Sequence, residues 1–223
     1  MPQHLQREIE KLKKKILSLC ASVEENVRMA VKSIEDRDTA LAERVIGLDP
    51  EIDQSEVDLE EDCLKILALY QPVAIDLRFI IAVLKINNDL ERIGDLAVNI
   101  AERSQFLSTQ TRIAIPFDLE ALAEKTQTML RRSLDSLVSL DATLARDVCL
   151  TDDEVDEINR EMYDLVKDAI RAHPNQLDIL IPYLSVSRYL ERIADHATNI
   201  AEDVIYMIEG VITRHGANSS WNQ

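Results

Sequence analysis

Hydrophobic residues recur at intervals of three and four along most of the chain, which is the spacing of one face of an α-helix. The first segment shows this pattern in the apolar positions Leu5, Ile9, Leu12, Ile16, Leu19, Val23, Val27, Ala30 and Ile34. Charged residues such as Arg7, Lys11 and Arg28 occupy the opposite face. The pattern predicts one amphipathic helix from Leu5 to about Arg37.

Start and stop signals divide the next part of the chain. Asp38 can cap a short helix over residues 40–48. Asp49 is a good N-cap and Pro50 a good first helical residue, so a new helix is predicted over 50–70.

The same signals continue to the end of the chain. We expect a helix from Gln71-Pro72 to about Leu107, followed by an aperiodic loop over Ser108–Pro116. In the second half we expect a helix over Phe117–Leu140, another that begins at Asp141, and one that is capped by Thr151-Asp152-Asp153 and runs to about His173. A turn at His173-Pro174-Asn175 then leads to a helix over Gln176–Ile212 and a polar tail that holds Trp221.

The second half of the chain repeats the first. Residues 90–102 (LERIGDLAVNIAE) and 190–202 (LERIADHATNIAE) are identical at ten of thirteen positions. Residues 49–53 (DPEID) likewise match 152–156 (DDEVD). The repeat predicts an all-α fold of six principal helices, in which two tandem three-helix bundles of ~100 residues arose by internal duplication. The expected domains are 1–110 and 111–213, followed by the tail 214–223.

Composition supports a helical fold and excludes several classes of function. Only 4 glycines and 6 prolines occur in 223 residues, which disfavours a turn-rich β-sandwich and leaves no glycine-rich phosphate loop. The net charge of −16 argues against nucleic acid and anionic lipid as partners. Three widely spaced cysteines, no apolar leader after Met1 and no apolar run of membrane-spanning length predict a cytoplasmic protein.

Part of the negative charge is ordered along helix faces. On a wheel that advances ~100° per residue, four polar residues of the third long helix fall within about 80°: Glu91, Asp95, Asn99 and Glu102. The second half repeats this stripe as Glu191, Asp195, Asn199 and Glu202. The preceding helices carry Asp49, Asp53, Glu56 and Glu60, and Asp152, Asp156, Asn159 and Tyr163.

Acids spaced by four residues repel each other by a few tenths of a kcal/mol per pair, and a cation between them reverses this. Two neighbouring helices that each contribute such a pair would offer four carboxylates to a hard cation. A single pair usually marks only a solvated face, whereas repetition at matched places in both halves favours metal binding. His196 points away from the acids, and the Glu-x-x-His pattern of di-iron bundles is absent.

At these segments the chain resembles the PhoU family. The resemblance rests on Glu-Arg-Ile-Gly-Asp at 91–95, Glu-Arg-Ile-Ala-Asp at 191–195, the Asn-Ile-Ala-Glu that follows each, and the sequence QPVAIDLR at 71–78. It extends over about residues 5–212. It implies two tandem three-helix bundles whose E/D-x-x-x-D motifs can carry multinuclear iron clusters, with zinc, manganese, magnesium and calcium as alternatives. These motifs fall on Asp49, Asp53, Glu91, Asp95, Asp152, Asp156, Glu191 and Asp195.

The resemblance further implies a cytoplasmic, non-enzymatic regulator of phosphate homeostasis that associates peripherally with membrane proteins. Its expected partners are a Pst-type phosphate transporter and a phosphate-sensing histidine kinase, and its expected effect is to restrain uptake and the starvation response. A homodimer is the expected assembly.

Three alternatives stay open on the sequence. The acids could belong to a carboxylate-bridged metalloenzyme, or to a structural helical adaptor that binds no metal. Arg92 and Arg192, beside the acids, are either salt-bridge partners or part of a docking surface, and the former is favoured.

Overall fold

The computed structural model describes residues 2–211, in which the chain forms six α-helices and one short 3-10 helix. The elements are α1 (Pro2–Asp36), α2 (Thr39–Tyr70), α3 (Ala74–Ser108), α4 (Leu119–Ser139), α5 (Ala142–Ala172), the 3-10 helix η1 (Pro174–Gln176) and α6 (Leu177–Glu209). The tail with Trp221 lies outside the described residues. None of these helices combines the length and the apolar character needed to cross a bilayer.

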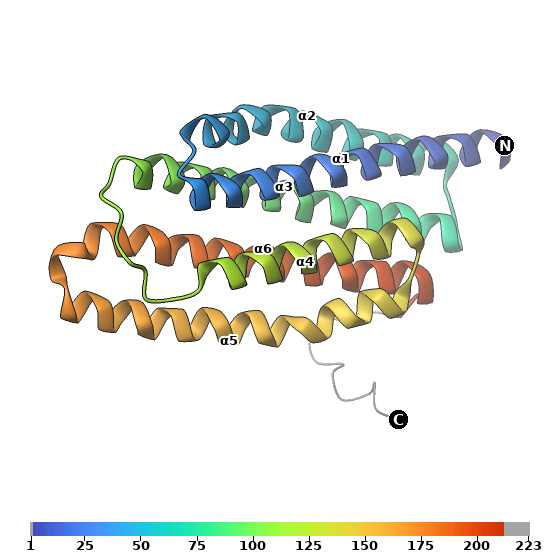
Figure 1. Ribbon diagram of the computed structural model, residues 1–223. Coiled ribbons are helices and arrows are strands. Elements are labelled where there is room, and N and C mark those ends of the chain that lie inside the picture. Colours follow the sequence, from blue (N-terminus) through green and yellow to red (C-terminus); the bar gives the residue numbers. More distant parts are fainter. Residues whose placement is uncertain (1, 212–223) are drawn as a thin grey trace, which may run out of the picture.

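The helices form two bundles that lie side by side along their length. Helices α1, α2 and α3 form one bundle, and α4, α5 and α6 form the other (Figure 1). α3 and α6 pack against each other at the junction, while the α2–α3 and α5–α6 connections lie at opposite ends (Figure 1). The predicted all-α fold of two tandem three-helix bundles is thus confirmed.

The first turn of each half is built in the same way. Arg37 and Leu140 end their helices in the left-handed conformation, at φ 53° each. The aspartate that follows caps the next helix: Asp38 accepts from the Leu41 amide at 3.0 Å, and Asp141 accepts from the Leu144 amide at 3.1 Å. Corresponding positions are 103 residues apart in both cases, so the duplication extends to the backbone conformation of the turns.

Two predicted helix breaks were wrong. Pro50 lies inside α2, and Asp49 is an interior residue of that helix and not its N-cap. Likewise α5 continues through Asp152 without a new start. A proline removes one backbone hydrogen bond and crowds one carbonyl, but buried residues on both sides of Pro50, including Val45 and Ile52, pack α2 as one rod. Tertiary packing therefore outweighs the local cap signal.

The core is aliphatic and continuous between the bundles. Its largest fully buried side chains come from α1, α2, α3 and α4 and include Ile16, Leu59, Ile80, Ile93, Ile100 and Leu130. α6 contributes Leu180, Leu190, Ile193 and Ile200. Burial of such side chains supplies roughly 1.5–3 kcal/mol each, so the two bundles are held together mainly by apolar packing.

A line of polar contacts also joins α3 to α6. Asp89 of α3 lies 2.8 Å from Nδ1 of His196 and accepts from the Asn199 amide at 3.3 Å. Further along, the Lys85 ammonium donates to buried Asp203 at 3.1 Å. The repeat does not duplicate these contacts. In the second half, the positions that correspond to Lys85 and Asp89 are occupied by Ser185 and Tyr189, which cannot form the equivalent ion pairs from α6 to α3.

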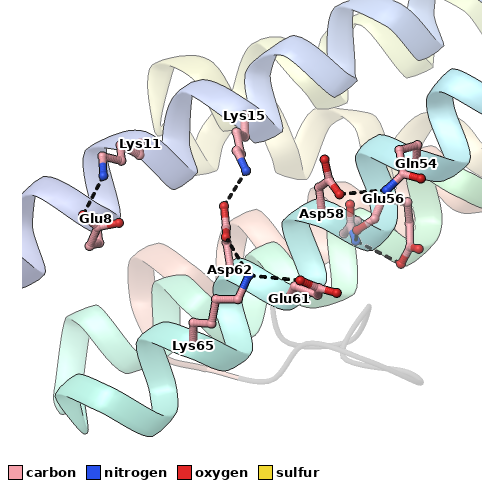
Figure 2. A network of polar contacts seen from close by, with 10 residues as sticks. Glu8, Lys11, Lys15, Gln54, Glu56, Asp58, Glu61, Asp62 and Lys65 are labelled. Carbon is pink, nitrogen blue, oxygen red and sulfur yellow. Dashed lines mark hydrogen bonds and ion pairs between the residues drawn. The ribbon is translucent and has the colours of Figure 1, made fainter.

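Ion pairs connect neighbouring helices at the surface. In Figure 2, Lys15 reaches from α1 to Asp62 on α2, where Lys65 also pairs with Asp62 and Glu61. Lys125 of α4 and Glu154 of α5 form a similar contact in the other bundle. Exposed pairs of this kind contribute at most about 1 kcal/mol each, so they order side chains more than they stabilise the fold.

α2 and α3 approach closely at Gly94, where an added Cβ would lie 3.3 Å from Cγ2 of Ile52. We expect Gly94→Val to destabilise the protein by about 1–3 kcal/mol, because the larger side chain overfills this contact. The measurement is the free energy of unfolding in urea. Gly47→Val is the matched control, since nothing lies within 4 Å of its added Cβ. An equal loss in both variants would contradict the close approach.

Candidate metal centres

The first acidic quartet consists of Asp49 and Asp53 on α2 and Glu91 and Asp95 on α3. Within each helix the two acids are four residues apart and therefore lie one turn apart on one face. The Ile52–Gly94 contact lies between them and holds the two helices together at this level. The sequence-predicted acids of the first half are thus brought together on the surface of one helix pair.

Burial, together with the crowding of like charges, raises the pKa of two acids of this quartet, Asp49 and Glu91. Partial burial raises the pKa of Asp49, and the nearby carboxylates of Asp53 and Asp95 add to the effect. Burial and then Asp95 raise the pKa of Glu91, although Arg92 acts in the opposite direction. Oδ1 of Asp49 is buried and has no hydrogen-bond partner within residues 2–211. An orphaned buried carboxylate oxygen is costly unless a proton or a cation satisfies it.

Arg92 is a salt-bridge partner in the first half. Its guanidinium lies 3.2 Å from Glu91 and 3.2 Å from Asp95. This bears out the interpretation favoured from the sequence. Arg192, by contrast, is exposed, and the structure gives it no ion pair within the described residues.

The second acidic quartet consists of Asp152 and Asp156 on α5 and Glu191 and Asp195 on α6. Three of these residues, Asp156, Glu191 and Asp195, each offer one oxygen within 4.8 Å of the others. Oδ1 of Asp152 is buried without a hydrogen-bond partner in the described part of the chain, as Asp49 Oδ1 is in the first quartet. The two quartets thus share their helical spacing, but within the described residues only the second brings three acidic oxygens this close together.

The charge conflict is stronger in the second quartet. Burial raises the pKa of Asp195 to about 6, helped by the carboxylates of Glu191, Asp152 and Asp156. Burial also raises the pKa values of Asp152 and Glu191, each with Asp156 among the contributing charges. Without a cation, Asp152, Glu191 and Asp195 hold protons more tightly than isolated carboxyls do.

The residues present fit an oxygen-ligated cation. Two ligands of a Ca²⁺-sized or Mg²⁺-sized ion lie at most roughly 4–5 Å apart, because each is about 2.0–2.6 Å from the metal. The three oxygens of the second quartet meet this limit before any adjustment. Their all-carboxylate chemistry suits hard cations and leaves the choice among iron, manganese, zinc, magnesium and calcium to geometry and availability.

The four additional polar residues predicted near the metals are placed differently. Asn99 donates to the Asp95 carbonyl at 2.9 Å, so its amide is turned along its own helix. Asn199 donates to Asp89, and Glu202 lies near Cys149 of α5. Glu102 is exposed, and no described contact links it to the quartet. His196 contacts Asp89, which agrees with its predicted direction away from the acids.

Two further side chains lie near the quartets. Glu56 of α2 lies close enough to Glu91 to raise that residue's pKa, and it accepts from the Asn87 amide at 3.0 Å. Thr198 has a buried hydroxyl near Asp152. This hydroxyl lowers the pKa of Asp152, whereas burial of the carboxyl raises it. Glu56 was visible as part of the acidic stripe on α2. The position of Thr198 beside the acids could not be predicted from the repeat, because its counterpart in the first half is the apolar Val98.

Comparison with known proteins gives matches along nearly the whole chain. A family model described as the PhoU domain matches twice, over residues 16–104 and 119–204. The phosphate-specific transport system accessory protein PhoU homolog 1 of Thermotoga maritima is 34% identical over 93% of this chain and 90% of its own length. The PhoU homolog of Pseudomonas aeruginosa is 36% identical over 96% of this chain and 88% of its own.

Solved structures give the same result. The crystal structure of PhoU from Pseudomonas aeruginosa superimposes with a TM-score of 0.89 at 34% identity, covering 92% of this chain and 99% of that one. The phosphate transport system regulatory protein PhoU from Streptococcus pneumoniae superimposes with a TM-score of 0.81 at 28% identity, over 93% and 98%.

The raised pKa of Asp195 predicts a pH-dependent stability difference. When a chelator keeps metal away, the folded protein binds the proton of the Asp195 carboxyl more tightly than the unfolded chain does. The stability that this proton contributes is therefore lost as the pH rises from 3.8 to about 6. We expect Asp195→Asn to gain stability relative to the parent protein as the pH is raised from 4.5 to 7.5. Urea titrations at both pH values measure this.

Glu157→Gln is the control for this experiment, because Glu157 is an exposed acid on α5. A gain for Asp195→Asn that is the same at both pH values, or a loss at pH 7.5, would contradict the charge conflict.

Proposed function

This chain belongs to the PhoU family, and we propose that it acts as an accessory protein of a phosphate-specific transport system. The observation that carries the proposal is the match of both repeats over nearly the full length of chain and relatives. The expected direct partner is therefore a Pst-type ABC phosphate transporter, met on its cytoplasmic side.

The finer role that we propose is negative regulation. When phosphate is plentiful, the protein would restrain uptake and, through a phosphate-sensing histidine kinase, dampen the starvation response. Support comes from two related proteins: one relative is a phosphate-specific transport system accessory protein, and one solved neighbour is a phosphate transport system regulatory protein. We propose that the working assembly is a homodimer located in the cytoplasm at the membrane surface.

We propose that the protein is not an enzyme. Burial raises the pKa of the Cys20, Cys63 and Cys149 thiols to about 12, so none of them is a thiolate nucleophile near neutral pH. The carboxyl groups of the quartets are arranged in open, partly exposed patches between two helices. A carboxylate-bridged metalloenzyme needs its acids to face into the bundle, as in di-iron proteins.

We propose that each acidic quartet binds a cation. Asp49, Asp53, Glu91 and Asp95 would hold one site, and Asp152, Asp156, Glu191 and Asp195 the other. The buried Asp49 Oδ1, which has no hydrogen-bond partner in the described residues, and the close approach of the Asp156, Glu191 and Asp195 oxygens support this most directly. A bound cation would neutralise the like charges and fix α2 to α3 and α5 to α6, which gives partners a rigid surface.

Arg192 is the arginine that we propose for partner docking. It is exposed beside the second quartet, whereas Arg92 is engaged by Glu91 and Asp95. A docking arginine pairs with a carboxylate of its partner. The docking role of Arg92 is correspondingly less favoured.

Metal titration tests the cation sites. We expect Mn²⁺ or Fe²⁺ to raise the melting temperature, because an ion at 100 times its Kd stabilises a site by about 2.7 kcal/mol. The Asp156→Asn, Asp195→Asn double variant should lose about half of the bound metal, and adding Asp95→Ala should lower it further. Elemental analysis after gel filtration measures the stoichiometry.

Asp168→Asn, an exposed acid paired with Arg171, is the control for the titration. Substoichiometric metal in the parent protein under metal-replete conditions would favour the alternative of a structural adaptor without metal.

Capture from native cells tests the partners. We expect the tagged chain to recover a phosphate transporter or a sensor histidine kinase under high phosphate, and Arg192→Glu to recover less, because reversing its charge repels an acidic contact. Arg28→Glu is the control, since Arg28 pairs with Glu25 on α1 away from the quartets. Recovery of neither partner under high phosphate would count against the proposed role.

A further inference from the structure

A groove of about 560 Å³ lies between α5 and α6 directly beside the second quartet. Asp156 and Glu191 form its acidic end, and the rest of its lining includes Arg160, Arg188 and Tyr163. Its volume lies within the range of small-molecule sites. The groove therefore combines two proposed metal ligands, two guanidinium groups and an aromatic ring.

The two arginines are available to a ligand. Both are exposed, and within residues 2–211 no ion pair or hydrogen bond is found for either. Two other arginines on these helices are engaged: Arg171 pairs with Asp168, and Arg146 pairs with Glu209. Arg188 lies close enough to Glu191 to lower that residue's pKa, but neither guanidinium is held by an ion pair within residues 2–211. Two such groups that line one groove favour an anion with several oxygens, because arginine binds phosphate in a bidentate manner.

The first half of the molecule lacks this arrangement. By the repeat alignment, Arg160 corresponds to Val57 and Arg188 to Asn88, while Tyr163 corresponds to Glu60. Duplication alone would keep the two faces alike. The second groove has thus acquired two positive charges and a ring at positions where the first carries an apolar, an amide and an acidic side chain.

The charges explain why such an anion site needs the cation. Without metal, the four acids of the second quartet outnumber Arg160, Arg188 and Arg192 and repel an anion. A divalent ion on the quartet reverses the balance. Mg²⁺-type ions are commonly held by one or two carboxylates together with the phosphates of a ligand, which is the geometry that this end of the groove offers.

We propose that this groove binds a nucleoside triphosphate, with the phosphate chain between the quartet's cation and Arg160 and Arg188, and the base stacked on Tyr163. Tyr163 is 56% exposed, so one face of its ring is open to a base. The inference rests on the proposed metal binding of the second quartet. It adds a ligand that neither the fold nor the acids alone would indicate.

Equilibrium dialysis with ATP, in the presence of a molar excess of Mn²⁺ over nucleotide, tests the proposal on the full chain. We expect one ATP per chain, binding that weakens at least tenfold without metal, and a loss of about tenfold or more for Arg160→Ala and for Arg188→Ala, because each removes a charged hydrogen bond. Arg171→Ala is the control and should bind as the parent protein does. Circular dichroism establishes that each variant is folded.

Two further probes separate the base from the phosphates. Inorganic tripolyphosphate should bind more weakly than ATP, and Tyr163→Ala should weaken ATP several-fold while leaving tripolyphosphate unchanged. Equal binding of both probes, with no effect of Tyr163→Ala, would overturn the nucleotide assignment. ATP binding that is unchanged in the Arg160→Ala, Arg188→Ala double variant would overturn the groove itself.

Metal content is measured on the same samples, so that the two proposals fail separately. Two ions per chain with no bound ATP would overturn the nucleotide site and leave the metal sites standing. Absence of metal from the parent protein would overturn both. Neither result touches the proposed association with the transporter, which native capture tests independently.

Discussion

Apolar packing holds like charges together in this protein. Beneath the first quartet, Ile52 of α2 lies against Gly94 of α3, and this contact fixes the helix pair at a distance that their carboxylates alone would not favour. The core supplies far more stabilisation than the few tenths of a kcal/mol by which each acid pair repels. The repulsion therefore remains as raised pKa values and as buried oxygens, Asp49 Oδ1 and Asp152 Oδ1, that lack partners. A cation satisfies both features at once.

The internal repeat places an acidic quartet in each half of the chain, and sequence divergence has made the two quartets unequal. In the first half Arg92 pairs with Glu91 and Asp95. In the second half Arg192 is exposed, and Arg188 lines a groove that also exposes Tyr163. Arg92 is thus held by ion pairs within its own quartet. Arg188 and Arg192 lie close enough to Glu191 to lower its pKa, but no ion pair of the described residues holds them, so their guanidinium groups remain open to a ligand. A two-repeat protein can in this way keep one site for structure and use the other for recognition.

The junction between the bundles is specific as well as apolar. Asp89 contacts His196, and Lys85 contacts Asp203. The equivalent contacts from α6 to α3 are not formed, because the repeat-related positions carry other residues. Such contacts favour the observed pairing of α3 with α6 over a slipped or exchanged arrangement. They also begin next to Asp195, so α6 carries a metal candidate and the contact to the other bundle on adjacent residues.

The sequence by itself determined the helical class, the repeat, the four acid pairs and the family, because periodicity, identity and spacing along a helix are local properties. It also indicated the turns at Asp38 and Asp141, whose caps act over three residues. Only the tertiary structure decided that α2 passes through Pro50, since packing against α3 outweighs a local break. It likewise decided which nitrogen and oxygen atoms meet: Asn199 turns to Asp89, Thr198 lies near Asp152, and Arg160 and Arg188 share a groove. Those encounters join separate helices or separate turns of a helix, and their geometry depends on how α5, α6 and α3 are packed.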